Sequence, residues 1–269
     1  MPDNKIACII PVKNRRHMVS EAIESALAQG RLPDEVIVVD DGSTDGTGEL
    51  VQKRFPMVKF LKGRSLGPGG ARNLGAMAAE AEVLMFLDSD DTWTDDHVEK
   101  LIKAMDGKKA CSFGITLNQG QCLDSAFTIP GREFQRHRPM EWNLFRWCSL
   151  VPSSVAVRKE AFLYAGGFPN VPLGEDWLFF ARLSLNYEFG FEPTVLTVRK
   201  IHSGNLCWKV FSQKLAITVV DRLTEMARNA GKCDYLTHLN KTRNLILDKG
   251  DKWKSVQEWY MALIKYGLL

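Results

Sequence analysis

The 269-residue sequence has no long apolar run and no ordered set of cysteines. No apolar stretch reaches the ~18 residues that a membrane-spanning helix needs. The six cysteines are scattered without a C-x-x-C pair, which argues against a zinc site and against a disulfide framework. A net charge of +3 is too small to indicate nucleic-acid binding, and the N-terminus has no signal-peptide pattern. We therefore expect a cytoplasmic globular protein, with at most peripheral contact at the inner face of a membrane.

Two acidic runs follow segments that have the composition of buried strands. Residues 40–43 (DDGS) follow the apolar segment 35–39, and residues 88–91 (DSDD) follow the apolar segment 83–87. In an open α/β sheet, ligands bind beyond the carboxyl ends of the strands. Carboxylates clustered there repel one another unless they bind a cation or hydrogen-bond donors. The two runs therefore predict a metal-assisted site for a phosphorylated ligand.

The second run has the spacing of a metal-binding pair. If the strand geometry continues, Asp88 and Asp90 point to the same side, and a cation that bridges two phosphates needs only one or two such carboxylates. The alternative is an Asp-rich turn or helix cap. At Asp41 two interpretations stay open, because the D-G pair is itself a turn signal, while the carboxylate could also accept from a base or a ribose.

Three further features are candidates for the same site. Residues 67–72 open a helix with a glycine-rich turn that matches neither Walker A nor G-x-G-x-x-G, and Arg72 would add donors for a diphosphate. Glu175 and Asp176 begin a later helix, where carboxylates also serve as simple caps. His202 could be a metal ligand, a phosphate donor or a surface histidine. A glycine-rich loop without a ligand is the alternative for the turn.

The order of expected elements predicts the fold class. The first hundred residues alternate strand and helix, which predicts a mostly parallel sheet with right-handed crossovers. The pattern loosens after residue 106, and the chain is expected to be helical from about residue 203. The expected strands of the first part are 6–12, 36–39, 58–61 and 83–87. The last segment places one face of apolar residues at helical spacing: Trp253, Val256, Trp259, Tyr260, Leu263 and Ile264.

Six short motifs, in this order, resemble those of the family 2 glycosyltransferases, which have the GT-A fold. They are Pro11-Val12-Lys13-Asn14, Asp40-Asp41-Gly42-Ser43, Gly70-Ala71-Arg72-Asn73, Asp88-Ser89-Asp90, Gly166-Gly167-Phe168 and Glu175-Asp176. The resemblance covers about residues 5–202. It implies a GT-A (Rossmann-like) α/β fold with a mixed, mostly parallel sheet flanked by helices. Residues 1–105 would be the nucleotide-sugar-binding half, 106–202 the acceptor-binding half, and 203–269 a C-terminal helical extension.

The same resemblance implies an inverting transferase that uses a nucleotide-sugar, most often a UDP-sugar, with Mn²⁺ or Mg²⁺. By position it assigns Asp176 as the catalytic base, with Glu175 beside it shaping the acceptor site. Asp90 would bind the metal, and His202 matches, more loosely, a histidine near the metal or diphosphate. Contacts with the nucleotide would come from Pro11, Val12, Asn14, Asp41, Arg72 and Asp88.

The chain also departs from the family pattern. Lys13, Arg15 and Arg16 make the first loop more basic than expected, which points to a diphosphate or to acceptor charge. The Q-x-x-R-W signature of processive synthases is absent, so we expect transfer of a single hexose to the hydroxyl of a glycan, a lipid-linked saccharide or another acceptor. The C-terminal helices have three open roles: covering the acceptor cleft, forming a homo-oligomer, or lying on a membrane.

Two other functions stay open. Residues 87–92 also fit the hhhDxDxT motif of haloacid-dehalogenase-like phosphatases, in which Asp88 would be the nucleophile and Asp90 the acid/base. That motif normally lies on the first strand, whereas three expected strands precede it here. The second alternative is a non-catalytic subunit that binds sugar nucleotides. A protein without a metal would gain by losing these carboxylates, which argues against it.

Overall fold

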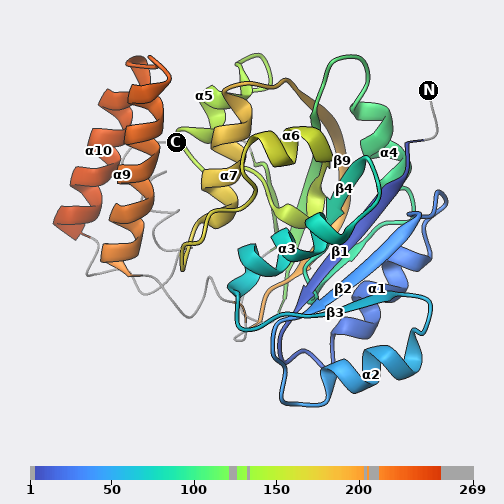
Figure 1. The fold of residues 1–269 in the computed structure, drawn as a ribbon. Coiled ribbons are helices and arrows are strands. Elements are labelled where there is room, and N and C mark those ends of the chain that lie inside the picture. Colours follow the sequence, from blue (N-terminus) through green and yellow to red (C-terminus); the bar gives the residue numbers. More distant parts are fainter. Residues whose placement is uncertain (1–3, 121–125, 132–133, 203–204, 206–211, 250–269) are drawn as a thin grey trace.

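The computed structural model describes residues 4–120, 126–131, 134–202, 205 and 212–249 (Figure 1). Within them, helices cover both faces of one twisted sheet, and two further helices stand at its side. The helices on the sheet are α1 (Val19–Leu27), α2 (Thr47–Arg54), α3 (Gly67–Ala78), α4 (His97–Ala104), α5 (Met140–Leu144), α6 (Lys159–Tyr164) and α7 (Glu175–Ser184). The two at the side are α9 (Gln213–Asn229) and α10 (Asp234–Lys249).

The described part of the chain forms a nine-stranded sheet of order β3-β2-β1-β4-β8-β6-β9-β5, with β7 paired to β6. Pairing is parallel from β3 to β4 and between β6 and β9, while β5, β7 and β8 run in the opposite direction. The expected mixed, mostly parallel sheet is therefore confirmed. The strands are β1 (Ile6–Val12), β2 (Glu35–Asp40), β3 (Lys59–Lys62), β4 (Val83–Phe86), β5 (Asp91–Trp93), β6 (Cys111–Gln119), β7 (Phe127–Ile129), β8 (Val155–Arg158) and β9 (Phe189–Lys200).

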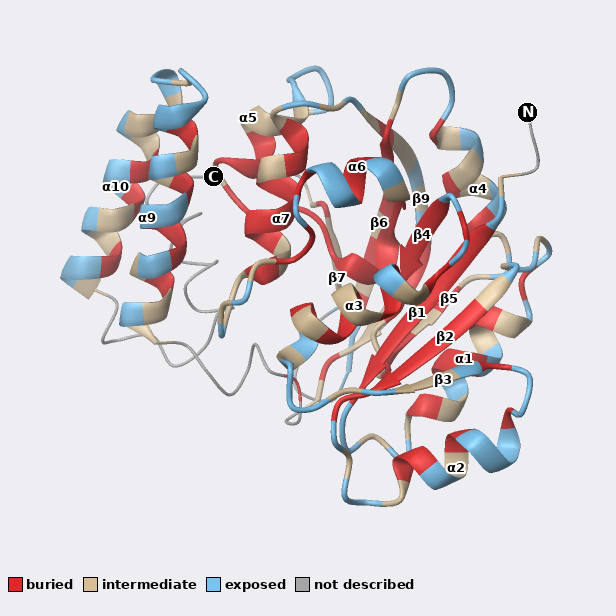
Figure 2. Cartoon of the chain, viewed as in Figure 1, coloured by how far each residue is buried: buried red, intermediate tan, exposed pale blue. Residues whose placement is uncertain are grey.

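The apolar residues of the central strands supply two cores, one on each face of the sheet. In β1, side chains alternate between the faces: Ala7 and Ile9 join the core under α3, α6 and α7, whereas Ile6, Cys8 and Ile10 join the core under α1, α2 and α4. All five are fully buried, as the red central strands of Figure 2 show. The run of consecutive apolar residues is thus the signature of a strand covered on both faces.

The register of the parallel strands brings three loops to one edge of the sheet. Val12 pairs with Asp40 and Ile9 pairs with Phe86, so the loops after β1, β2 and β4 leave the sheet side by side. The chain winds outward from β1 through β2 to β3 and then returns to place β4 on the other side of β1. A topological switch point of this kind opens a crevice at the carboxyl ends of the strands.

The second half of the sheet differs from the sequence pattern. The sequence pattern predicts neither β5 nor β9. β5 has only three residues, too few to show an alternation, and in β9 Gly190 and Pro193, both unfavourable inside strands, interrupt the apolar alternation. Pairing of β9 with β6 nevertheless continues through a register shift near Ile115. As a result Asp91 is a strand residue that lies opposite Arg199, instead of the end of a free acidic loop.

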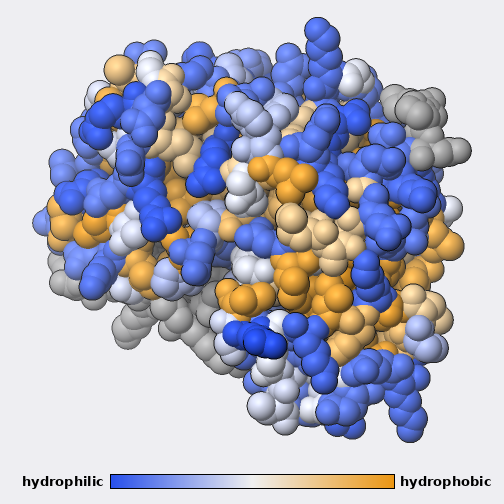
Figure 3. All heavy atoms as spheres, viewed as in Figure 1, coloured by the Kyte–Doolittle hydropathy of each residue, from blue (hydrophilic) through white to orange (hydrophobic). Residues whose placement is uncertain are grey.

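The C-terminal helices α9 and α10 pack on each other, and α9 also packs on α7. Ala216, Val219 and Leu223 of α9 join the core that α7 shares. The aromatic face expected over residues 253–264 lies outside the described residues. None of the helices described here is both long and apolar enough to cross a membrane. On the face shown in Figure 3, hydrophobic side chains gather over the middle while the rim is mostly hydrophilic.

Candidate active site

A cavity of about 690 Å³ lies at the edge where the loops after β1, β2 and β4 meet the N-termini of α3 and α7. Its volume is typical of a site for a small molecule or cofactor. Nine of the ten side chains predicted from the sequence border it: Pro11, Val12, Asn14, Asp41, Arg72, Asp88, Asp90, Glu175 and Asp176. The tenth, His202, is not a lining residue, but its Nε2 lies 3.2 Å from Oδ2 of Asp90, which is one.

Arg72 links the two halves of this cavity. Its Nη2 donates to Asp88 Oδ1 at 2.6 Å and its Nη1 donates to Glu175 Oε1 at 3.1 Å, while the guanidinium lies 5.3 Å from the centre of the Phe168 ring. Arg72 is only 4% exposed. Burial alone lowers the pKa of Arg72, but the charges of Asp88 and Glu175 outweigh it and raise this pKa above its ordinary value. The guanidinium therefore stays charged and fixed.

The glycines before Arg72 make this close packing possible. A Cβ atom at Gly69 would lie 2.9 Å from Glu175 Cγ and 3.2 Å from Phe168 Cβ, so a side chain there would push α3 away from α7. Gly67 has a φ of +75°, the left-handed conformation that favours glycine. The glycine-rich turn thus brings the helix start close to Glu175.

Asp41 holds the N-terminus of α3. Its Oδ1 accepts the N–H of Leu66 at 2.7 Å and its Oδ2 accepts the N–H of Gly67 at 2.9 Å. Gly67 belongs to the glycine-rich turn noted in the sequence, and its N–H is thus bound by a carboxylate of the protein. Each carboxylate oxygen keeps a second lone-pair direction, so Asp41 can still accept from a ligand in the cavity that it borders.

Asn14 connects the loop after β1 to the loop after β2 through hydrogen bonds. It has a φ of +53°, its N–H donates to Ser43 Oγ at 2.9 Å, and its Oδ1 accepts the N–H of Thr44 at 2.8 Å. Asparagine tolerates the left-handed conformation better than most residues. The side chain of Asn14 is thus engaged in shaping the cavity floor beside Pro11 and Val12.

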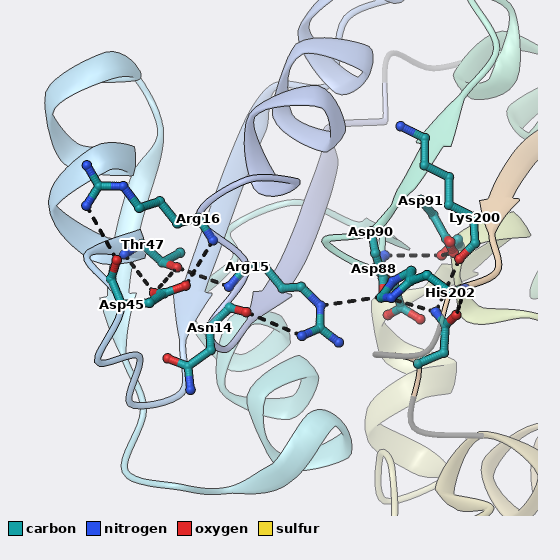
Figure 4. A network of polar contacts seen from close by, with 12 residues as sticks. Asn14, Arg15, Arg16, Asp45, Thr47, Asp88, Asp90, Asp91, Lys200 and His202 are labelled. Atoms are coloured by element: carbon teal, nitrogen blue, oxygen red, sulfur yellow. Dashed lines mark hydrogen bonds and ion pairs between the residues drawn. The ribbon is translucent and has the colours of Figure 1, made fainter. Parts of the chain in front are cut away.

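Asp90 is the centre of a second polar cluster, shown in Figure 4. Its Oδ2 lies 3.2 Å from both His202 Nε2 and Asn205 Nδ2, and 3.6 Å from Arg15 Nε. Arg15 reaches it from the loop after β1, as Figure 4 shows. The basic character of that loop, noted in the sequence, therefore has a definite location: one cation faces the D-x-D segment.

Asp91, next to this cluster, is fully buried. Its Oδ2 accepts from Ser153 Oγ at 2.6 Å, while its Oδ1 has no hydrogen-bond partner among the described residues. Burial, and then the charges of Asp88 and Asp90, raise the pKa of Asp91 well above its ordinary value. The opposing charge of Arg199 thus does not fully compensate the burial of Asp91 beside Asp88 and Asp90.

This imbalance suits a divalent cation. In the chain as described, no three His, Cys, Asp or Glu side chains form a ready-made metal cage. Mg²⁺ and similar hard cations, however, usually take one or two carboxylates and complete their shell with waters and substrate phosphates. Asp90, flanked by Asp88 and the imidazole of His202, offers such a partial donor set at the cavity wall.

Glu175 and Asp176 are the first two residues of α7 and follow Gly174, an N-cap residue in the left-handed conformation. Burial, together with the neighbouring charge of Asp176, raises the pKa of Glu175 to about 7. Burial also raises the pKa of Asp176, opposed by Arg72 and by the N–H of Trp177, which donates to Asp176 Oδ1 at 2.7 Å. Carboxyl groups with raised pKa values are suited to proton transfer near neutral pH.

Sequence reasoning missed two cavity residues that bear directly on these acids. Arg199, at the end of β9, borders the cavity, and its charge opposes the rise in the pKa of both Asp91 and Asp176. Trp147 forms part of the wall on the other side and lies 5.7 Å, ring to ring, from Trp177. The sequence feature that could have pointed to Arg199 is the apolar alternation of β9, which Gly190 and Pro193 interrupt.

Comparison with known proteins agrees with the resemblance. The family described as Glycosyl transferase family 2 matches residues 7–161, which is more than half of the chain. An uncharacterized glycosyltransferase of Rickettsia felis is 41% identical over 106 residues, which are 39% of this chain and 18% of that protein. The chain therefore spans under a fifth of the length of this curated relative.

Solved structures share the fold. S. aureus TarS, residues 1–349 in complex with UDP-GlcNAc, superposes with a TM-score of 0.73 at 22% identity, covering 90% of this chain and 72% of that one. The mannosyltransferase PcManGT from Pyrobaculum calidifontis, in complex with GDP-Man and Mn²⁺, gives a TM-score of 0.58 at 19% identity, covering 85% and 64%. The GT-A fold is confirmed by these neighbours. With its family match, its fold and its clustered motifs, the chain belongs to glycosyl transferase family 2.

Proposed function

We propose that the chain transfers a single sugar from a UDP-sugar to an acceptor hydroxyl, with inversion at the anomeric carbon and with a divalent metal. The observation that carries the proposal is the convergence of Asp41, Asp90 and Asp176, from distant parts of the sequence, on one cavity. The similar TarS structure contains UDP-GlcNAc and the similar mannosyltransferase contains GDP-Man and Mn²⁺. These neighbours support a nucleotide-sugar donor and a metal for this chain.

The donor would lie at the end formed by the loops after β1, β2 and β4. Asp41 would accept from the base, and Asp88 from the ribose, while Pro11 and Val12 form the apolar floor. The buried guanidinium of Arg72 would orient the diphosphate side of the donor. Asp90, with Asp88 and His202 beside it, would hold Mn²⁺ or Mg²⁺, which when bound neutralises the charge that the departing nucleoside diphosphate develops.

The acceptor would enter from the side of α7. Its hydroxyl is a poor nucleophile, so a base must take the proton as the new bond to the anomeric carbon forms and the bond to the diphosphate breaks. Asp176 would accept that proton. Glu175, fixed by Arg72 at 3.1 Å, would keep the start of α7 in place beside it. Attack opposite to the leaving group inverts the anomeric centre.

The other two functions fit less well. In a phosphatase of the kind considered, Asp88 would attack phosphorus, but here it is held by Arg72 at 2.6 Å and follows the fourth strand of the chain. Membership of glycosyl transferase family 2 also favours sugar transfer over phosphoryl transfer. A non-catalytic binding subunit would have no use for Asp176 or for the raised pKa of Glu175.

A donor screen with one variant tests the proposal. Wild-type protein is given UDP-, GDP- and dTDP-sugars with Mn²⁺, and release of the nucleoside diphosphate is measured. We expect slow turnover of a UDP-sugar, a loss of ~10²–10⁴-fold in Asp176→Asn, and unchanged affinity of that variant for UDP. Asp106→Asn, which changes an exposed carboxylate far from the cavity, is the matched control. Equal turnover by both variants would remove Asp176 from the role of base.

A further inference from the structure

Outside the active-site cavity, three arginines around α5 stack on aromatic rings. The guanidinium of Arg136 lies 5.4 Å from the centre of the Phe191 ring, and those of Arg138 and Arg146 lie 5.5 and 4.6 Å from that of Trp142. These separations are within the range of cation–π contacts. Planar guanidinium groups held on aromatic faces are pre-organised donors for carboxylate or phosphate oxygens.

No carboxylate among the described residues neutralises this group. Arg136, Arg138 and Arg146 form no ion pair with the described part of the chain. The acid of α5, Glu141, pairs instead with Lys232, in the turn between α9 and α10, at 3.1 Å. Arg138 and Arg146 lie against the same Trp142 ring. Two neighbouring cations without a counter-charge repel one another, and an anionic ligand would relieve that repulsion.

One of these arginines, Arg146, and the Trp142 ring that it shares with Arg138 border a recess that contains an unsatisfied hydroxyl. A cavity of about 200 Å³ is lined by Trp142, Arg146, Trp147 and Ser149, among others. Ser149 is only 3% exposed, and its Oγ has no hydrogen-bond partner among the described residues. A buried hydroxyl without a partner costs free energy, so this recess is suited to a ligand that carries a hydrogen-bonding group into it.

The recess is joined to the active site through one wall. Trp147 borders both cavities, and its ring packs at 5.7 Å on that of Trp177, the residue after Asp176. The indole N–H of Trp177 donates to the carbonyl of Leu144 in α5 at 2.5 Å. Helix α5, which carries Trp142, is therefore packed next to α7, the helix that carries the proposed base.

We propose that this surface, formed by Arg136, Arg138, Trp142, Arg146 and Ser149, binds the acceptor, and that the acceptor is a glycan or polyol chain bearing phosphate or carboxylate groups. The inference rests on the proposed transfer function, which supplies the hydroxyl acceptor. A single chain can follow Trp147 from the recess to Asp176. The flat surface of a bilayer cannot reach the hydroxyl of Ser149, which favours a flexible anionic chain over a membrane.

Binding of defined polyanions tests this directly. Affinity is measured for polygalacturonate, for a phosphodiester-linked glycerol polymer, for neutral dextran and for phosphatidylglycerol vesicles. The double variant Arg138→Gln/Arg146→Gln is compared with Lys53→Gln/Lys103→Gln, which removes the same two charges from exposed positions on α2 and α4. Should the first double variant fold poorly, Arg138→Gln alone is used, since Arg138 is exposed.

We expect wild-type protein and the lysine variant to bind one of the two anionic polymers and not dextran, and the arginine variant to lose at least about tenfold in affinity. The polymer that binds identifies phosphate or carboxylate as the group recognised. Equal losses in both variants, or binding to vesicles without binding to either anionic polymer, would overturn the proposal. Wild-type hydrolysis of UDP-sugars, measured separately, tests the transfer function, so failure of that function and failure of this surface give different results.

Discussion

Arg72 of α3 donates through its Nη2 to Oδ1 of Asp88, in the loop after β4, at 2.6 Å. The same guanidinium holds Glu175, 103 residues further along the chain, through its other terminal nitrogen. One buried cation thus fixes the D-x-D segment relative to the start of α7. The donor end and the acceptor end of the proposed site have a common support.

Replacing Arg72 by methionine should therefore damage both stability and ligand binding. Removing one partner of a buried ion pair leaves the other charges uncompensated and typically costs about 3 kcal/mol or more. Urea denaturation should show this loss for Arg72→Met, together with weaker binding of UDP by calorimetry. The control is Arg54→Met, which breaks an exposed pair with Glu24 and should cost under about 1 kcal/mol. Similar unfolding midpoints for the two variants would contradict the supporting role of Arg72.

The raised pKa of Glu175 predicts a pH dependence of stability. Burial raises this pKa from 4.5 to about 7, so the folded state holds the proton more tightly than the unfolded state does. The contribution of Glu175 to the free energy of unfolding should consequently decrease as the pH rises from about 4.5 to 7. In Glu175→Gln, which keeps the shape and an acceptor for Arg72, that contribution is absent.

The measurement is urea denaturation of both proteins between pH 4.5 and 7.5. Other carboxylates contribute to each curve, and Asp176 and Asp91 contribute with the same sign as Glu175. The difference in the free energy of unfolding between wild type and variant isolates the contribution of Glu175. As the pH rises, the variant should become more stable relative to wild type. Parallel curves would show that Glu175 is not protonated at mildly acidic pH in the folded protein.

The sequence predicts the donor end of this site better than the acceptor end, for physical reasons. Asp41, Asp88 and Asp90 follow apolar strands, and parallel strands necessarily bring their carboxyl ends together. Arg199 lies on β9, a strand that Gly190 and Pro193 make hard to recognise in the sequence. The residues that pair with it are set by a register shift between β6 and β9, which no local sequence pattern predicts.

Contacts that depend on tertiary packing were also beyond the sequence. Asp41 can accept hydrogen bonds from the N–H groups of Leu66 and Gly67 only because α3 begins close to the end of β2. The stacking of Arg146 on Trp142 needs a short helix, α5, whose five residues give little periodicity. Motifs identify the chemistry of individual residues, whereas the contacts that hold those residues in place are seen only in the folded chain.

Asp90→Ala should separate metal binding from nucleotide binding. Affinity for UDP is measured by calorimetry with Mn²⁺ and in the presence of a chelator. Wild-type protein should bind UDP at least about tenfold more tightly with Mn²⁺, because the cation offsets phosphate charge beside the carboxylates. The variant should lose that difference while it keeps the metal-free affinity. Asp95→Ala, at an exposed position near the start of α4, is the control, and an unchanged response to Mn²⁺ in Asp90→Ala would exclude Asp90 as the ligand.

Gly69→Ala should be harmful, although the same change in a helix usually stabilises a protein by about 0.5–1 kcal/mol. The added Cβ would lie 2.9 Å from Glu175 Cγ, so Glu175 must move away from Arg72 and the contact at 3.1 Å lengthens. We expect a lower melting temperature and a kcat reduced about tenfold, since small displacements at a proton-transfer site are costly.

Gly30→Ala is the control for that variant, because its Cβ would meet only Asp95 O at an ordinary 3.7 Å. It should leave kcat unchanged, and any change in melting temperature should be small. A rise in the melting temperature of Gly69→Ala with normal kcat would mean that the space beside Glu175 can accommodate a methyl group. The close approach of α3 to α7 would then have no part in positioning Asp176, and the support that Arg72 gives to both ends of the site would have to act through Asp88 alone.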